Sequence, residues 1–309
     1  MQKLLTLAAA VLVATAAFSQ PKTDLRPDET VLLYAESADS LCDPVVGKTL
    51  SFAGFTIGED NGLRGKEVVK PSGNISNISE YARLDLYFPA EPNGQMIIVC
   101  PGGGYRFVAT YNEGLYVADW MLRRGTAVCV VKYRMPDHHW KVPVEDVQNA
   151  FRYCRDKAQQ WGVSKIGVMG FSAGGHLAAM ASTLYVDEMT RPDFSVLIYP
   201  VITFTESKSG TRNVLSDTPD PYFNTDTHVT ESTPPAFLAL CSDDPSVPPI
   251  HSILYYNALY AHGVTGELHI YPTGKHGWGF TTSAFGKDKI AYCRNEFFTS
   301  LNRFLDTQK

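Results

Sequence analysis

The sequence predicts a single α/β domain whose mostly parallel central sheet is covered by helices on both faces. From residue 83 onward, short and nearly continuous apolar segments alternate with longer stretches of helical periodicity. Connections of this kind place consecutive strands in parallel, with a helix over the sheet. The chain has 309 residues, of which 44% are apolar, and this is enough for one large core. We therefore expect one domain over residues 20–309.

The alternation can be followed along the chain. An alternating segment at 84–88 and an apolar run at 96–100 predict two strands, joined as a hairpin by a turn at 91–94. Later strands are expected at residues 126–132, 165–169, 194–199, 235–241 and 266–271. Helices are expected at residues 113–124, 144–161, 174–185, 249–262 and 287–305. The order is that of successive strand–helix–strand units.

Two segments fall outside this rhythm. Residues 20–80 are rich in Gly, Ser, Asn and Asp and show little helical periodicity, which predicts an extended N-terminal lead-in. Residues 201–232 form a polar, proline-containing connection between two predicted strands. Because long connections in compact domains are usually functional or mobile, we expect a lid-like insertion on the substrate side.

The first 19 residues have the pattern of a signal peptide. Lys3 precedes an apolar run from Leu4 to Phe18, and the small residues Ala17 and Ser19 have the spacing of a cleavage site. A membrane-spanning helix is the alternative, but the run is shorter than the ~20 apolar residues that a bilayer requires. We therefore expect a soluble, exported protein, periplasmic or extracellular, with no membrane partner.

Composition argues against several other partners. The net charge is −5 and no basic stretch is interleaved with aromatic residues, so no nucleic-acid partner is expected. Cysteine and histidine show no zinc-site spacing, so we expect no metal and no cofactor. Three cysteines lie in apolar strand segments and are interpreted as buried free thiols: Cys100, Cys129 and Cys241. The sequence leaves the other three unassigned: Cys42, Cys154 and Cys293.

The strongest motif is the pentapeptide Gly-Phe-Ser-Ala-Gly at 170–174, which matches G-x-S-x-G. Glycines in this pattern let a strand turn abruptly into a helix and leave the serine exposed. A glycine-rich turn without function is the alternative. A buried strand is predicted immediately before the motif and a helix immediately after it, as this geometry requires. Ser172 is therefore the predicted nucleophile.

A serine hydroxyl is too weakly acidic to attack a carbonyl unaided, so it needs a base and a carboxylate that orients the base. Ligand sites of parallel sheets lie at the carboxyl ends of strands, where we find Asp243, Asp244 and His276. His276 is the predicted base, within a glycine-flanked loop. Asp243 is preferred as the orienting acid because it comes first after its strand, with Asp244 interpreted as a local cap or turn former. Three rival bases lie at helix ends or inside a strand: His251, His262 and His269.

A glycine run at 102–104 follows the strand predicted at 96–100. Attack on an ester carbonyl creates an oxyanion that needs preorganised N–H donors, and glycine lets the backbone approach the substrate closely. We predict that the N–H groups of Gly103, Gly104 and Ala173 form this oxyanion hole. The alternative is a plain flexible loop after a strand.

With these segments in order, the sequence resembles the serine esterases of the α/β-hydrolase superfamily, especially the acetyl xylan esterase and BD-FAE-like group. The resemblance spans residues 80–305. It is carried by Pro-Gly-Gly-Gly-Tyr at 101–105, Glu-Gly at 113–114, Tyr-Arg at 133–134, Gly-Phe-Ser-Ala-Gly-Gly-His at 170–176, Thr-Pro-Pro-Ala-Phe at 233–237, Asp-Asp at 243–244 with Val-Pro at 247–248, and His-Gly-Trp-Gly at 276–279.

The resemblance implies an α/β-hydrolase fold and assigns the acid role to the first aspartate of the pair, Asp243. Tyr105 and Trp278, which lie in the glycine-run and histidine motifs, are the predicted substrate contacts. The implied activity is a serine carboxylesterase that removes acetyl or other small acyl groups from xylan-type carbohydrate through an acyl-serine intermediate. The substrate partner is then an acylated carbohydrate or a small ester.

Two other functions remain open at this point. The first is a serine peptidase resembling the catalytic half of prolyl oligopeptidases, although 309 residues leave no room for the extra domain that those enzymes usually carry. The second is a non-catalytic carbohydrate-binding protein on a hydrolase fold, because a fold does not guarantee a function. A complete set of serine, histidine and carboxylate argues against the second.

Overall fold

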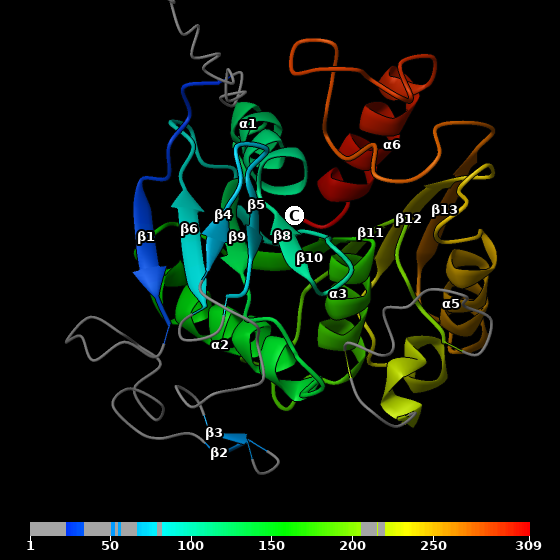
Figure 1. Ribbon diagram of the computed structural model, residues 1–309, viewed down its shortest axis with the longest axis horizontal. Coiled ribbons are helices and arrows are strands. Elements are labelled where there is room, and N and C mark those ends of the chain that lie inside the picture. The colour runs from blue at the N-terminus through cyan, green and yellow to red at the C-terminus, as the bar shows by residue number, and fades with distance from the viewer. Residues whose placement is uncertain are drawn as a thin grey trace, which may run out of the picture.

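The computed structural model describes residues 23–33, 67–78, 82–204, 215 and 220–309, together with the backbone of residues 51–52 and 55–56. Two predictions lie wholly or largely outside the described residues: the signal peptide at 1–19 and most of the lead-in at 20–80. Of the insertion predicted at 201–232, residues 205–214 and 216–219 also lie outside them. The described residues form a three-layer α/β/α arrangement with the sheet in the middle (Figure 1).

The central sheet has eight strands in the order β1-β6-β9-β7-β10-β11-β12-β13. Six of them, β7 and β9 to β13, run parallel to one another, and β6 is antiparallel to both β1 and β9. The strands are β1 Glu29–Leu32, β6 Arg83–Tyr87, β7 Gln95–Cys100, β9 Ala127–Lys132, β10 Lys165–Phe171, β11 Ser195–Ile198, β12 Ala236–Cys241 and β13 Gly266–Tyr271. The mostly parallel sheet predicted from the sequence is confirmed.

Short strands form two smaller sheets away from the central one. β4 (Val68–Val69), β5 (Asn74–Ser76) and β8 (Phe107–Ala109) form one of them, and β2 (Ser51–Phe52) pairs with β3 (Phe55–Thr56) in the other. β8 directly follows the glycine run, so this small sheet adjoins the predicted oxyanion loop.

The predicted hairpin between the first two strands is wrong. β6 pairs with β9 and β1, whereas β7 lies between β9 and β10. All six residues of β7 are buried, which requires a strand on each side and a helical layer on each face. The turn predicted at 91–94 could have paired β6 with β7, but the central position of β7 makes parallel neighbours the arrangement that buries it.

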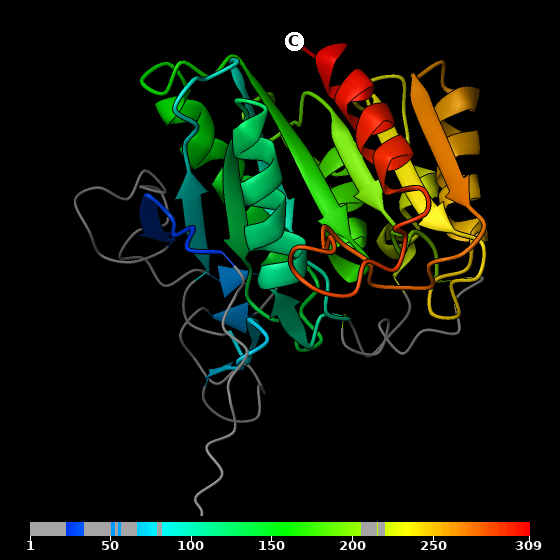
Figure 2. The same cartoon turned by 90° about the horizontal axis from the view of Figure 1, so that it is seen from above.

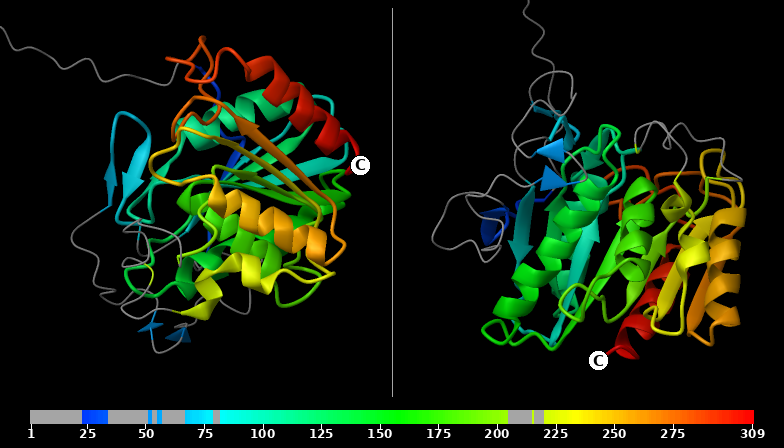
Figure 3. Two further views of the ribbon diagram at one scale, coloured as in Figure 1. Left: turned by 90° about the vertical axis from the view of Figure 1, so that its right-hand side faces the viewer. Right: turned by 90° about the horizontal axis from the view of Figure 1, so that it is seen from below.

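Helices cover both faces of the sheet, as predicted. α1 (Tyr116–Arg123) and α6 (Arg294–Asp306) lie on one face, and α2 (Lys141–Ala158), α3 (Ala173–Thr183) and α5 (Ile250–Ala261) on the other (Figures 1 and 3). Each layer buries its own core. Among the described residues, no helix is both long enough and apolar enough to span a bilayer.

The sequence of β7 shows how one strand supplies both cores. Met96, Ile98 and Cys100 pack with α2, α3 and α5, whereas Ile97 and Val99 pack with α1 and α6. Successive strand side chains point to opposite faces, so a strand covered on both sides must be apolar throughout. This is why a continuous apolar run, rather than an alternating one, predicted a central strand.

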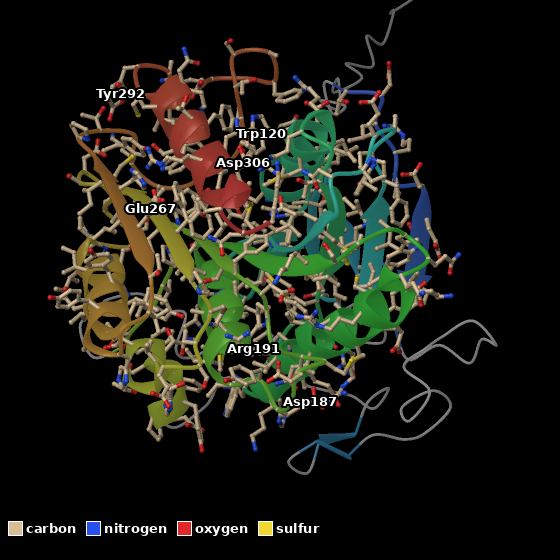
Figure 4. All side chains as sticks on the ribbon, turned by 180° about the vertical axis from the view of Figure 1, so that it is seen from behind. Trp120, Asp187, Arg191, Glu267, Tyr292 and Asp306 are labelled. Atoms are coloured by element: carbon tan, nitrogen blue, oxygen red, sulfur yellow. The ribbon has the colours of Figure 1, made fainter. Side chains whose placement is uncertain are left out.

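The helices α1 and α6 are adjacent on their face of the sheet (Figure 2). Trp120 of α1 lies beside α6 in Figure 4. Its ring stacks on that of Phe298, with ring centroids 4.8 Å apart. Asp306, at the end of α6, forms a 2.7 Å ion pair with Arg124, the residue that follows α1. The closing helix is therefore held to the first one by both apolar and charged contacts.

Three helix predictions differ from the structure at their first turns. The helix expected at 144–161 begins earlier, at Lys141. The helix expected at 113–124 begins as a π-helical turn over residues 111–115, in which the Leu115 N–H donates to the Thr110 carbonyl at 2.7 Å. The helix expected at 287–305 begins only at Arg294. Arg294 pairs with Asp288 at 2.7 Å and donates to the Gly279 carbonyl at 3.0 Å, so the preceding residues form a loop folded back on this side chain.

The cysteines of the described residues are free and buried, which confirms the interpretation for three of them: Cys100, Cys129 and Cys241. Cys154 and Cys293, which the sequence left unassigned, are also free. Cys42 lies outside the described residues.

Candidate active site

Ser172 lies at the sharp turn between β10 and α3. Its backbone has φ 55° and ψ −118°, a conformation that a residue with a side chain rarely adopts and that costs on the order of 1–3 kcal/mol. The turn is possible because Gly174 packs directly against the end of β7: a Cβ there would lie 2.1 Å from the Cys100 carbonyl oxygen. The strained turn predicted from the G-x-S-x-G motif is therefore present.

Three side chains from the ends of three strands form a continuous hydrogen-bonded chain. The His276 Nε2 atom lies 2.8 Å from the Ser172 Oγ atom, and its Nδ1 atom lies 2.6 Å from the Asp244 Oδ2 atom. Ser172 follows β10, Asp244 follows β12 and His276 follows β13. The His276 side chain is 22% exposed and that of Asp244 is fully buried. An imidazole between a hydroxyl and a buried carboxylate can accept the proton of the hydroxyl and stay oriented while it does so.

The acid beside the histidine is Asp244, and the prediction of Asp243 is wrong. Asp243 is exposed, and its Oδ1 atom accepts a 2.8 Å hydrogen bond from the Lys275 backbone N–H. Asp244 is buried, and its Oδ1 atom accepts from the Ser246 and Val247 N–H groups at 2.8 and 2.9 Å. Asp244 does form a local turn, as the alternative interpretation had it. The same bonds fix its carboxylate and leave Oδ2 for the histidine.

The rival histidines have other partners. His251 is buried, and its Nδ1 atom accepts from the Ile202 and Thr203 N–H groups at 3.0 and 3.2 Å. His269 lies 3.1 Å from Glu267 on β13. Burial lowers the pKa of His251 to about 4, a shift that nearby Asp244 only partly opposes. It is therefore neutral at physiological pH and serves as a fixed acceptor for two backbone groups.

His251 provides a prediction for the pH dependence of stability. Its pKa is about 4 in the folded protein and about 6.5 in an unfolded chain. Between these values only the unfolded chain takes up the proton, so the contribution of His251 is fully present above the unfolded pKa and is lost as the pH falls toward 4. We expect His251→Asn, whose amide oxygen can accept the same bonds, to remove this loss.

Chemical denaturation of the wild type and of His251→Asn at pH 7 and pH 4.5 measures the stability that His251 loses on acidification. The stability advantage of the wild type over His251→Asn should shrink by about 2 kcal/mol at the lower pH. Other groups cancel in this difference because both proteins contain them. An unchanged or larger advantage at pH 4.5 would contradict a buried neutral histidine.

The glycine run lies directly against the serine. A Cβ on Gly102 would be 3.1 Å from the Ser172 Cβ atom. Gly103 has φ 142°, and a Cβ there would lie 1.9 Å from the Phe107 carbonyl oxygen, so only glycine fits. Within the described part of the chain, no acceptor is bonded to the N–H groups of Gly103, Gly104 or Ala173. Unpaired donors beside the serine fit the predicted oxyanion hole.

Tyr105 and Trp278 do not line a substrate surface, contrary to the prediction. Tyr105 is fully buried, and its hydroxyl lies 2.9 Å from the Nδ1 atom of His176. Trp278 is 1% exposed and packs edge-on against Tyr199 and Phe297. Both are large apolar rings next to glycines, and such rings fill the space behind tight loops. They support the loops of the site from within.

Three residues that contact the site were not singled out in the sequence. His176 lies one turn below Ser172, and its Nε2 atom binds the Phe223 carbonyl at 2.8 Å. Burial lowers its pKa to about 4, so it is neutral. Glu113 accepts from the Gly102 N–H, and Tyr199 packs against the His276 ring. Glu113 and His176 lie within the family motifs, so the motifs could have indicated a role for them. Tyr199 carries no such signal, because it is only the last residue of a predicted strand.

Comparison with known proteins agrees with this geometry. The BD-FAE family profile matches residues 84–209, which contain the glycine run and the serine turn. The crystal structure of an acetyl ester-xyloside bifunctional hydrolase from Caldicellulosiruptor lactoaceticus superposes with a TM-score of 0.62 and 33% sequence identity, over 72% of this chain and 89% of that one.

The chain belongs to the BD-FAE group of the α/β-hydrolase superfamily. The α/β-hydrolase fold predicted from the sequence is thereby confirmed. Asp244 and His276 lie beyond the segment that the BD-FAE profile matches, so the structure, not the profile, brings them to Ser172.

Two curated relatives extend this comparison. An acetylxylan esterase of Xylanibacter ruminicola is 38% identical over 214 residues, which are 65% of this chain and 44% of that protein. Endo-1,4-beta-xylanase B of Butyrivibrio fibrisolvens is 31% identical over 230 residues, which are 66% of this chain and 35% of that protein. This BD-FAE chain thus spans less than half the length of either curated relative.

Proposed function

We propose that this protein is an exported serine carboxylesterase that removes acetyl or other small acyl groups from xylan-type carbohydrate. The observation that carries the proposal is the continuous chain from the Ser172 Oγ atom through His276 to the buried Asp244 carboxylate. The unpaired N–H groups of the glycine run beside Ser172 support acyl chemistry in particular, because they can bind the oxyanion that forms at an ester carbonyl.

The proposed reaction has two halves. The Ser172 oxygen bonds to the acyl carbon while its proton passes to the Nε2 atom of His276, and the carbonyl oxygen becomes an oxyanion. The carbonyl re-forms, the bond to the sugar oxygen breaks, and that oxygen takes the proton from His276. Water then attacks the acyl-serine with His276 again as base, which releases the carboxylic acid and restores the serine. The buried Asp244 side chain orients His276 and stabilises the imidazolium in both halves.

The carbohydrate part of the proposal rests on the relatives. Two of them are named for acetyl esters or for acetylxylan, and a third for xylan cleavage. Export rests on the signal-peptide pattern of residues 1–19. N-terminal sequencing of the mature chain checks it: a start near residue 20 in a periplasmic or extracellular fraction supports export, and an intact Met1 contradicts it.

A panel of esters tests the function. We expect the purified protein to release acetate from acetylated xylan and acetylated monosaccharides, and to hydrolyse aryl acyl esters faster as the acyl chain shortens. A fluorophosphonate probe should label Ser172, as read by peptide mass spectrometry. Cleavage of a proline-containing peptide with no ester hydrolysis would instead indicate a peptidase. Binding of polysaccharide with no labelling at Ser172 would indicate a non-catalytic protein.

A further inference from the structure

A buried carboxylate lies behind the glycine run. Glu113 comes from the π-helical turn at 111–115 and is 4% exposed. Its Oε2 atom accepts from the Gly102 N–H at 2.7 Å, and its Oε1 atom accepts from the Tyr199 hydroxyl at 2.7 Å. π-Helical turns are rare and occur frequently at functional sites. None of the proposed reaction steps uses this carboxylate directly.

Tyr199 connects Glu113 to the loop that carries His276. Its hydroxyl oxygen accepts from the Gly279 N–H at 2.9 Å, three residues after His276. Its ring lies against the imidazole, with centroids 4.8 Å apart. The residue has φ 38°, an unfavourable conformation for a residue other than glycine, directly after the end of β11. Strain of this kind persists only where the surroundings fix the conformation.

Together these bonds join two loops that are far apart in the sequence. One end is Gly102, whose loop lies against Ser172 and carries the unpaired N–H groups. The other end is Gly279, in the loop that carries His276. We propose that Glu113 and Tyr199 are positioning residues that fix the oxyanion loop and the histidine loop relative to each other. Over the residues that the structure describes, the hydrogen bonds of the two side chains go to each other, to Gly102 and to Gly279, and not to Ser172 or His276.

The identity of the buried group supports this role. A buried carboxylate is stable only when hydrogen bonds satisfy it, and a well-packed apolar pair is often as stable or more so. Burial raises the pKa of Glu113 above its ordinary value, whereas the bonds from Tyr199 and Gly102 and the charge of His276 oppose this rise. A carboxylate can accept from two donors on its two oxygens at once, which is what holding a backbone N–H and a phenol together requires.

Two near-isosteric variants test the proposal, which rests on the proposed function because its readout is ester hydrolysis. Glu113→Gln has one acceptor oxygen, so its amide group faces one of the two donors. Tyr199→Phe keeps the ring against His276 but leaves the Gly279 N–H without its acceptor. We expect each variant to lower kcat for an aryl acetate by about 10- to 100-fold. KM should stay within about twofold, because both side chains are buried behind the loops of the site.

The double variant shows whether Glu113 and Tyr199 act together or independently. If both residues act through the same bond, Glu113→Gln with Tyr199→Phe should lose no more activity than the more damaged single variant. Tyr255→Phe is the matched control, because it removes the hydroxyl of another fully buried tyrosine, on α5. It should keep the wild-type kcat. Thermal melting ensures that every variant is folded at the assay temperature, and Tyr199→Phe decides alone if Glu113→Gln does not fold.

Each outcome has a defined meaning. A selective loss of kcat that does not multiply in the double variant supports the positioning role. Single variants with kcat within about twofold of the wild type, or losses that multiply in the double variant, overturn it. A wild type inactive on every ester overturns the proposed function and this inference together, whereas an active wild type with unaffected variants overturns this inference alone.

Discussion

Replacing Ser172 by alanine is expected to reduce kcat for an aryl acetate by roughly 10⁶-fold. The reason is that the acyl-enzyme route depends on the Ser172 Oγ atom, and a water molecule near His276 is not held in the same position for attack. Residual acceleration should come only from the oxyanion donors and substrate binding. Initial rates measured with wild-type and variant protein over several decades of enzyme concentration provide the comparison.

The variant should fold normally. Alanine has the same Cβ as serine, so the strained φ of 55° at this position is neither relieved nor worsened. Ser182→Ala, in the helix α3 that follows Ser172, is a matched control, since its buried hydroxyl donates to the Ala178 carbonyl at 2.8 Å. It should keep full activity. If Ser172→Ala retained activity while folded, ester hydrolysis would have to occur elsewhere on the protein.

The features that the sequence predicted well are those determined by short stretches of chain. The turn around Ser172 requires glycine on both sides of a serine between a strand and a helix, and all of this lies within about ten residues. The covered sheet follows from runs such as Met96 to Cys100, which are apolar at every position. For the serine turn and for the covered strand, the local sequence is compatible with one stable local structure.

The errors arose where the answer depends on segments far apart in the sequence. Whether β6 pairs with β7 or β9 depends on which strand must lie in the middle of the sheet. Tyr105 and Trp278 are aromatic and adjacent to functional loops, yet they face the core because His176 and Phe297 lie behind them. Periodicity within a segment contains no information on such partners.

The choice between the two aspartates is another case of this kind. Position relative to the end of β12 favoured Asp243, but the direction of each carboxylate depends on the turn that follows. The backbone N–H groups of Ser246 and Val247 hold Asp244, whereas the N–H of Lys275 holds Asp243. Capping a turn and orienting a histidine are not alternatives, because a carboxylate has two oxygens and Asp244 uses one for each role.

This distinction leads to the second large effect. We expect Asp244→Asn to lower kcat by about 10⁴-fold and Asp243→Asn to change it by less than about threefold. In Asp244→Asn the amide oxygen can still accept from the Ser246 and Val247 N–H groups, which turns the NH₂ group toward the Nδ1 atom of His276. Nδ1 must then accept, so the proton moves to Nε2, and Nε2 can no longer take the proton of Ser172.

The paired variants control for each other. Both convert one carboxylate to an amide in neighbouring positions, so each removes the same single charge from this edge of the sheet. Asparagine at 243 can still accept from the Lys275 N–H, and its exposed side chain is solvated in either form. Steady-state kinetics at pH 7 to 8 on both variants decides the assignment. A large loss in Asp243→Asn with activity retained in Asp244→Asn would mean that the histidine is oriented by the exposed carboxylate during turnover, against the arrangement of the buried one.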